Sequence, residues 1–269
     1  MLPGYAARRF ERAAGLAAVN EARTISRVVV VTGAAGAIGS ATVGAFLALG
    51  FHVVGLDRDE QAMRHARHTP VRVDLEDERA LERAIADVHS IGPLIHVVGI
   101  AGGALPSEPA LSDDVLGLDA STFRASIEAN LTTQFLVLRA TFAWLRENPG
   151  MDRSVTFTSS FNALAGWGMP AYSAAKAGLI GMTYALTAPL GAAGIRVNVL
   201  APGTVRTPRT ERLWSHEPGH FEELERTTAL RRLAVPEDAA RAFVALATML
   251  THMTGQVLVL DGGQMVKRS

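Results

Sequence analysis

The sequence of 269 residues contains no cysteine, which excludes disulfide bonds and thiolate metal ligands. Its eight histidines are scattered, and we predict no metal site. Lys plus Arg number 26, as do Asp plus Glu. With no excess of either sign, neither a nucleic acid nor an anionic membrane is an expected partner.

Long apolar runs are also missing. No stretch reaches the ~18 apolar residues that a membrane-spanning helix requires, and no signal-peptide core precedes the first predicted strand. We therefore expect a cytoplasmic protein, and the lack of cysteine suits a reducing compartment. The length is within the range of one α/β domain with a large core.

Tyr172 and Lys176 are four residues apart, so on a helix they would share a face. A nearby ammonium group favours the phenolate, which lowers the pKa of a tyrosine from about 10. Such a tyrosine can exchange a proton with an alcohol or carbonyl oxygen. Ser159 and Ser160 precede it by thirteen and twelve residues. Tyr-x-x-x-Lys alone is a common helix pair, so the interpretation depends on the rest of the chain.

A glycine-rich turn follows the first predicted strand. The β-branched run at 27–32 leads into Gly33, Gly36 and Gly39, and a small, apolar, helix-like stretch follows. Glycines let the backbone approach a pyrophosphate, and the helix N-terminus supplies N–H groups. The next strand ends in Asp57, 24 residues after Gly33, where an acidic group meets the adenosine ribose. These features predict a dinucleotide site.

Together with later segments in order, these residues resemble the short-chain dehydrogenase/reductase family over about residues 27 to 263. The further matching segments are Val73-Asp74-Leu75, Asn130 with its neighbours, Gly194 to Gly203, Thr207, and Thr254 to Gly263. Alternating patterns predict strands at about 28–32, 51–56, 71–74, 94–98, 153–159, 195–200 and 256–260, with helices between them. The expected fold is α/β, a Rossmann-type doubly wound sheet of seven parallel strands with helices on both faces.

The resemblance also implies the roles of individual residues. The catalytic set would be Asn130, Ser160, Tyr172 and Lys176, with Ser159 as the alternative serine, and Asn130 would anchor a water molecule beside Lys176. The cofactor would be bound by Gly33, Gly36, Ala37, Ile38, Gly39, Asp57, Arg58, Asp74, Leu75, Gly99, Tyr172, Lys176, Pro202, Gly203, Val205 and Thr207.

Two segments depart from the family pattern. The glycine spacing 0, +3, +6 is more usual in the extended branch of sugar-nucleotide enzymes. At the fourth strand, His96-Val97-Val98-Gly99 stands where Asn-Asn-Ala-Gly is expected, and Gly99 would keep backbone clearance for the cofactor. An epimerase or dehydratase of the extended branch is thus an alternative. The chain has no room for that branch's added C-terminal domain, which favours the single-domain type.

We predict NAD rather than NADP as the cofactor. The Asp57 carboxylate can accept hydrogen bonds from both ribose hydroxyls and would repel a 2′-phosphate. Positions 34, 35 and 37 are alanine, where NADP users often have Arg or Lys. Arg58 is the contrary feature, because it could turn onto a phosphate.

We divide the chain into an extension, residues 1–26 with a possible short helix at 6–23, and one catalytic domain, 27–269. Two turn-rich segments, 102–121 and 207–231, follow strands at their carboxyl ends, where ligands bind; the second matches the family's substrate lid. The first could instead be a solvated surface loop, and the Trp214 and Phe221 of the second could pack on the domain's own core. Phe161, Trp167 and Met169 would line a pocket for a substrate with a ring or alkyl portion, unless they too belong to the core.

The predicted function is hydride transfer between a nicotinamide cofactor and a secondary alcohol or ketone, with Tyr172 as general acid and base. A non-catalytic dinucleotide sensor or scaffold is the alternative from another class. The complete set of four catalytic residues favours the enzyme. We also expect a homotetramer, as in most family members, with close helix contact permitted by Ala171, Ala174, Ala175, Ala177 and Gly178.

Overall fold

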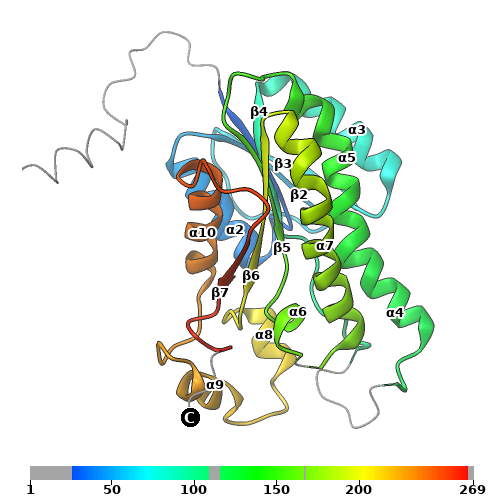
Figure 1. Cartoon of the computed structure of the whole chain (residues 1–269), viewed down its shortest axis with the longest axis vertical. Helices are drawn as coiled ribbons and strands as arrows, with labels where there is room; N and C mark the ends of the chain where they lie inside the picture. Colours follow the sequence, from blue (N-terminus) through cyan, green and yellow to red (C-terminus); the bar gives the residue numbers. More distant parts are fainter. Residues whose placement is uncertain (1–25, 109–115, 167, 266–269) are drawn as a thin grey trace, which may run out of the picture.

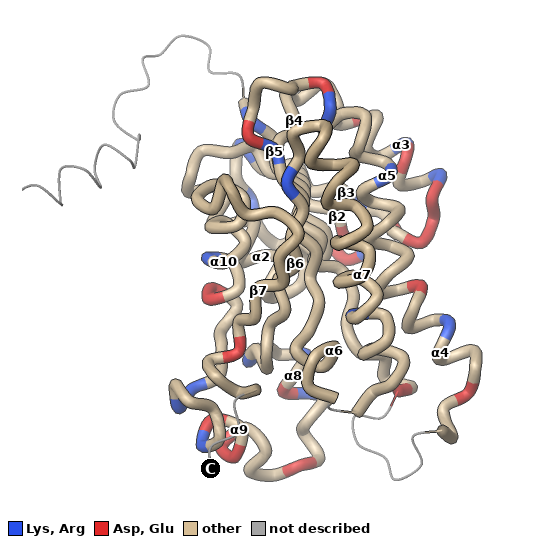
Figure 2. The backbone as a smooth tube through the Cα atoms, viewed as in Figure 1, with Lys and Arg blue, Asp and Glu red and all other residues tan. Residues whose placement is uncertain are grey.

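The computed structural model describes residues 26–108, 116–166 and 168–265 (Figure 1). The predicted helix at 6–23 and Trp167 lie outside the described residues. No helix within the described part of the chain is long and apolar enough to cross a membrane. Acidic and basic residues are interspersed on both sides of the sheet (Figure 2).

A seven-stranded parallel sheet forms the centre of the molecule, in the order β3-β2-β1-β4-β5-β6-β7. This confirms the predicted fold. The strands are β1 (Val28–Thr32), β2 (His52–Asp57), β3 (His68–Arg72), β4 (Leu94–Gly99), β5 (Arg153–Thr158), β6 (Ile195–Pro202) and β7 (Val257–Leu260).

The third strand begins three residues earlier than predicted, at His68 rather than at position 71. It lies at the edge of the sheet and contains Pro70, paired in register with Gly55. Val73 donates its N–H to the Asp57 carbonyl of β2. Successive backbone nitrogens of a strand point to opposite sides, so the nitrogen of Pro70, three residues earlier, points away from β2. A proline is tolerated there because no N–H is required.

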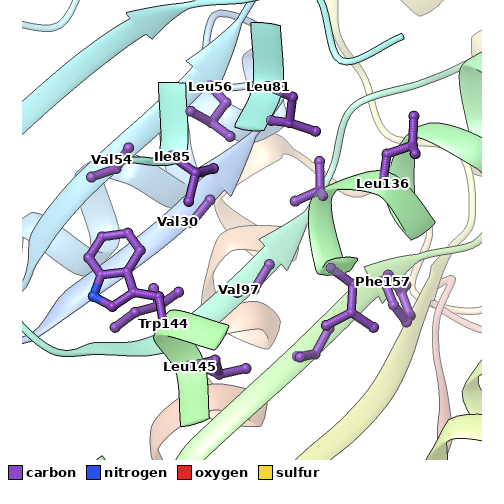
Figure 3. Packing of buried hydrophobic residues seen from close by; sticks show 14 of the residues in the cluster. Val30, Val54, Leu56, Leu81, Ile85, Val97, Leu136, Trp144, Leu145 and Phe157 are labelled. Atoms are coloured by element: carbon purple, nitrogen blue, oxygen red, sulfur yellow. The ribbon is translucent and has the colours of Figure 1, made fainter. Parts of the chain in front are cut away.

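Helices cover both faces of the sheet. On one side α2 (Ala37–Ala48) and α10 (Pro236–Thr248) pack together, and on the other lie α3 (Glu78–Val88), α5 (Thr133–Arg146) and α7 (Pro170–Ala192) (Figure 1). Each face has its own apolar cluster. The larger one joins Val30 and Val97 of the sheet to Leu81, Leu136 and Trp144 of the helices (Figure 3).

Short helices gather near the carboxyl ends of the strands. They are α6 (Asn162–Ala165), α8 (Pro208–Leu213) and α9 (His220–Thr227), and α4 (Ala120–Ile127) extends on the same side (Figure 1). A 3-10 turn, η1 (His89–Ile91), precedes β4 at the opposite end. The predicted lid at 207–231 is thus largely helical, and the predicted loop at 102–121 ends in the first residues of α4.

His96 is a buried polar residue of β4. Its Nδ1 lies 2.9 Å from the Ser154 Oγ of β5, and its ring is 5.8 Å from the Phe51 ring and 6.4 Å from the Phe46 ring. Burial lowers the pKa of His96 to about 3; Asp152 opposes this shift, whereas Arg196 and Arg27 add to it. The imidazole is therefore neutral at physiological pH.

The small residues of α7 do not all face outward as the assembly prediction requires. Ala171 and Ala175 are fully buried within the chain, and a Cβ at Gly178 would lie 2.7 Å from a methyl group of Leu131. Only Ala174 and Ala177 of the five are exposed. For the buried Ala171 and Ala175 the prediction was wrong, because their small size serves packing inside the subunit. Gly178 is partly exposed, and its role in assembly stays a prediction.

Candidate active site

Tyr172 projects from the first turn of α7, and Lys176 follows one turn later. The Lys176 Nζ lies 5.6 Å from the centre of the Tyr172 ring and donates a hydrogen bond of 2.9 Å to the Thr158 carbonyl at the end of β5. The Ser160 side chain lies close enough to the Tyr172 phenol to lower its pKa by hydrogen bonding. The structure thus brings three of the four predicted catalytic side chains together where β5 ends.

The two adjacent serines face different partners. The Ser159 hydroxyl donates to the Lys176 backbone carbonyl at 2.8 Å. Besides Tyr172, the Ser160 hydroxyl has Asn162 as a neighbour, with its Oγ 3.3 Å from the Asn162 Oδ1. Because consecutive side chains of an extended segment point in opposite directions, only one of the two can face the phenol. The geometry favours Ser160.

Ionisation of the pair differs from the sequence-based expectation. Burial raises the pKa of the Tyr172 phenol, while the Ser160 hydrogen bond and the Arg209 charge lower it and the Glu108 charge raises it. Burial, with a further contribution from Arg209, lowers the pKa of Lys176 to about 7. The prediction that Lys176 lowers the Tyr172 pKa is wrong for the protein alone, because the buried ammonium is itself poorly solvated.

Asn130 occupies a π-helical turn, η2 (Glu128–Thr132), between α4 and α5. Its amide nitrogen donates to the Ser126 and Gly103 carbonyls at 3.0 and 3.1 Å, and its Oδ1 accepts from the Gly103 N–H at 2.6 Å. Such turns recur at functional sites. The side chain fixes the loop after β4, so water anchoring by Asn130 remains a prediction.

The glycine turn has the geometry that a dinucleotide needs. Gly33 has φ +66°, and a Cβ on it would lie 2.9 Å from the Ala101 nitrogen. A Cβ on Gly39 would lie 1.9 Å from the Gly33 carbonyl oxygen, so α2 starts in direct contact with the turn. Gly36 precedes α2 with no side-chain cap and no acidic residue in the first turn. The free N–H groups at this helix start fit a pyrophosphate.

Asp57 lies against this turn at the end of β2. Its Oδ2 accepts the Ala35 N–H at 2.9 Å and its Oδ1 accepts the Asp59 N–H at 3.0 Å. Arg58 is exposed beside it, and the Arg72 Nε donates to the Arg58 carbonyl at 3.0 Å. Arg72 was not singled out from the sequence. Its position at the end of the neighbouring strand β3 could have indicated that it lies close to Asp57 and Arg58.

The remaining predicted cofactor residues border the same end of the sheet. Asp74 is exposed and Leu75 is buried after β3, Pro202 ends β6, and Val205 bridges to Ala234. The Thr207 hydroxyl caps α8 by accepting the Thr210 N–H at 3.2 Å. Ala37, Ile38 and Gly203 are partly exposed.

Gly99 differs from its predicted role. It is the last residue of β4, and a Cβ on it would lie 1.9 Å from the Gln134 Oε1. The clearance at Gly99 is therefore taken up by a side chain of α5. The Gln134 Nε2 donates to the Ala101 carbonyl at 2.7 Å. The turn that faces the glycine-rich segment starts later, at Ile100 and Ala101, whose N–H groups both donate to the Thr32 hydroxyl.

Two charged residues near Tyr172 were not found from the sequence. Arg209 of α8 donates to the Gly102 and Ala104 carbonyls at 3.2 and 2.6 Å, which joins the segment after β6 to the loop after β4. Glu108, in that loop, is buried and accepts hydrogen bonds from the start of α7. No short motif marks either residue.

The aromatic and apolar residues assigned to the pocket have mixed positions. Phe161 and Met169 are buried, which supports the core alternative over the pocket prediction. Trp214 stacks on the His220 ring at a centroid distance of 4.0 Å. The Arg206 guanidinium lies 4.9 Å from the centre of the Phe221 ring. The lid's aromatic residues thus pack within the lid segment.

His216 and His220 are four residues apart, a spacing seen in metal sites when both side chains share a helix face. Here Pro218 and Gly219 separate them and α9 begins only at His220. The His220 Nδ1 lies 2.9 Å from the Glu217 Oε2. No group of three potential ligands gathers among the residues described.

Comparison with known proteins shows which sequences this chain resembles. The sequence model of the family described as Enoyl-(Acyl carrier protein) reductase matches residues 33–265. The cis-4-hydroxycyclohexanecarboxylate dehydrogenase of Sinomonas cyclohexanicum is 33% identical over 254 residues, 88% of this chain and 96% of the relative. The L-fucose dehydrogenase of Oryctolagus cuniculus is 31% identical over 252 residues, 90% of this chain and 86% of the relative.

One solved structure is also similar to this chain over most of its length. The crystal structure of an oxidoreductase of the short-chain dehydrogenase/reductase family from Burkholderia thailandensis superimposes with a TM-score of 0.81. Its sequence is 35% identical, and the match covers 91% of this chain and 94% of that chain.

Proposed function

Because the chain belongs to the short-chain dehydrogenase/reductase family, whose dehydrogenase relatives act on alcohols, we propose that it oxidises a secondary alcohol with NAD. The observation that carries this proposal is the grouping of Tyr172, Ser160 and Lys176 where β5 ends. In this proposal Tyr172 is the proton acceptor, which is the role that a tunable phenol next to a hydroxyl donor fills.

The nicotinamide cofactor, when bound, supplies the acceptor for the hydride. The residues that would hold it are those of the Gly33–Gly39 turn for the pyrophosphate and Asp57 for the adenosine ribose. Lys176 would bind the second ribose with its ammonium group. The uncapped start of α2 and the carboxylate at the end of β2 support this fit.

The chain's own residues would perform the proton transfer. The Ser160 hydroxyl would hydrogen-bond the substrate oxygen and keep it near Tyr172. The Tyr172 phenolate would accept the hydroxyl proton during oxidation and return it during reduction. Arg209 lowers the pKa of both Tyr172 and Lys176, which opposes the effect of burial on the phenol. Orientation and pKa tuning are thus the protein's contribution.

We infer that the substrate carries its hydroxyl group on a ring. The two named relatives support this inference, since their names give a hydroxycyclohexanecarboxylate and fucose as substrates.

The test is a screen of cyclic secondary alcohols, followed by absorbance of the reduced cofactor, with the parent and Tyr172→Phe. The variant should lose about 10²–10⁴-fold in kcat and keep the parent's cofactor affinity. Tyr184→Phe, on the exposed side of the same helix, is the matched control and should equal the parent. Turnover by Tyr172→Phe within a few-fold of the parent would contradict the proposal.

A further inference from the structure

Glu108 is a buried carboxylate outside the predicted catalytic set. Its residue is 1% exposed, and it lies in the loop between β4 and α4. Glutamate is rarely buried unless it has a partner that compensates its charge. Among the described residues, no Lys, Arg or His forms an ion pair with it, so its partners must be found elsewhere.

Those partners are the first free N–H groups of α7. The Glu108 Oε1 accepts the Ala171 N–H at 2.8 Å, and both of its oxygens lie 3.1 Å from the Tyr172 nitrogen. The Ser126 hydroxyl of α4 donates to Oε2 at 3.3 Å. Every one of these partners among the described residues is neutral, and the positive end of the helix dipole compensates the charge.

The start of α7 needs such a partner from elsewhere in the chain. Its N-cap residue, Met169, has φ +51° and makes no side-chain cap, and Pro170 has no N–H to offer. The next two N–H groups belong to Ala171 and Tyr172, which are the groups that Glu108 binds. A residue 64 positions earlier in the sequence therefore does what an N-cap side chain ordinarily does.

The loop that contains Glu108 is also held near its beginning. Asn130 bonds to both backbone groups of Gly103, and Arg209 donates to the carbonyls on either side of it. The loop thus joins η2, α8 and the backbone of Tyr172. A shift of Glu108 would move the phenol relative to Ser160.

We propose that Glu108 is a positioning residue for the reaction, which fixes the Tyr172 backbone and sets the charge around the phenol from the N-terminal end of α7. The role rests on the proposed function of Tyr172. Its charge acts against that of Arg209 from α8, which lowers the pKa of Tyr172. Because Glu108 raises the pKa of Tyr172, its removal should make the phenol a stronger acid.

The first test needs no substrate. The chain contains three tyrosines, so the Tyr172 titration can be taken as the ultraviolet difference between each protein and the same protein with Tyr172→Phe. Glu108→Gln keeps the size of the side chain and removes its charge. Its Tyr172 midpoint should move to lower pH. Asp77→Asn, the same change at the N-cap of α3, should leave the midpoint unchanged.

The second test uses turnover. With a substrate from the screen, Glu108→Gln should lower kcat about 10- to 100-fold. The pH dependence of kcat should shift to lower pH, as the Tyr172 midpoint does. The KM for NAD should stay within about twofold of the parent value. An unshifted Tyr172 midpoint together with parent-like kcat would overturn the inference.

If Glu108→Gln does not fold, Glu108→Asp is the variant to measure. It keeps the negative charge but shortens the side chain by one methylene, which moves the carboxylate away from the start of α7. It should lower kcat, and an unchanged kcat would overturn the inference. The proposed function fails separately: it falls if Tyr172→Phe retains turnover, whatever the Glu108 variants do.

Discussion

The hydroxyl of Ser159 donates to the backbone carbonyl of Lys176 at 2.8 Å, so this side chain belongs to the attachment of α7 to β5. The neighbouring Ser160 hydroxyl instead interacts with the Tyr172 phenol and lowers its pKa. Two serines that the sequence pattern left as alternatives thus have different partners.

This difference predicts opposite outcomes for two alanine variants. Ser160→Ala should lower kcat about 10²–10³-fold, as loss of a hydrogen-bond donor to a reacting oxygen does, with little loss of stability. Ser159→Ala should keep most of kcat and lose about 1 kcal/mol of unfolding free energy. Steady-state kinetics and urea unfolding of both variants provide the check, and the reverse pattern would assign catalysis to Ser159.

Cofactor preference should depend on Asp57. We expect the parent to prefer NAD over NADP in kcat/KM by about tenfold or more, equal to ~1.4 kcal/mol. Asp57→Asn should reduce this preference, because the amide repels a 2′-phosphate less. Asp59→Asn, two residues further and exposed, is the control and should behave as the parent.

A parent that prefers NADP would instead assign the phosphate to Arg58 or to Arg72, which is hydrogen-bonded to the Arg58 carbonyl. Arg58→Ala and Arg72→Ala, measured with both cofactors, would then identify which arginine is responsible.

Buried His96 should make the fold sensitive to acid. Its pKa is about 3 in the folded chain and about 6.5 in an unfolded one. Between these values the unfolded chain binds the additional proton, so stability rises with pH across that window. The contribution is complete above about pH 6.5 and is lost as the pH falls toward 3. His96→Asn, neutral throughout, should show a smaller loss of unfolding free energy between about pH 7 and pH 5.

The matched control for that experiment is His252→Asn, because His252 is exposed. It should keep the parent's pH dependence in urea unfolding. If His96→Asn also keeps it, another group is responsible for the acid sensitivity.

We expect a homotetramer that uses the outer faces of α5 and α7. Phe135 of α5 is 47% exposed and Tyr184 of α7 is 58% exposed, and Ala174 and Ala177 add small exposed positions on α7. Phe135→Glu with Tyr184→Glu should lower the mass measured by light scattering. Leu116→Glu, at a residue that is 91% exposed, should not. A monomeric parent at micromolar concentration would refute the assembly.

The sequence predicts the fold well because its signals are local. A β-branched run, a glycine turn and a helix with a glycine stop are recognisable within about twenty residues, and their alternation implies the parallel sheet. The exception is β3, where Pro70 disguises a strand that only its edge position allows.

The candidate site is less predictable because its properties come from long-range contacts. Tyr172 and Lys176 are adjacent on a helix whatever surrounds them, but their pKa values depend on burial by distant segments. Glu108 has the sequence context of a solvated loop residue, and only the folded chain brings it to α7. The outward direction of the α7 alanines likewise depends on which face the sheet covers.

Pro70 has a consequence for how chains meet one another. Among the described residues no strand pairs with the outer side of β3, and open sheet edges recruit strands from other molecules into aggregates. Pro70 lacks a backbone N–H in the middle of this five-residue strand, so a strand that approaches this edge cannot form an uninterrupted row of backbone hydrogen bonds. Partially unfolded neighbours are thus discouraged from adding a strand to this edge of the sheet.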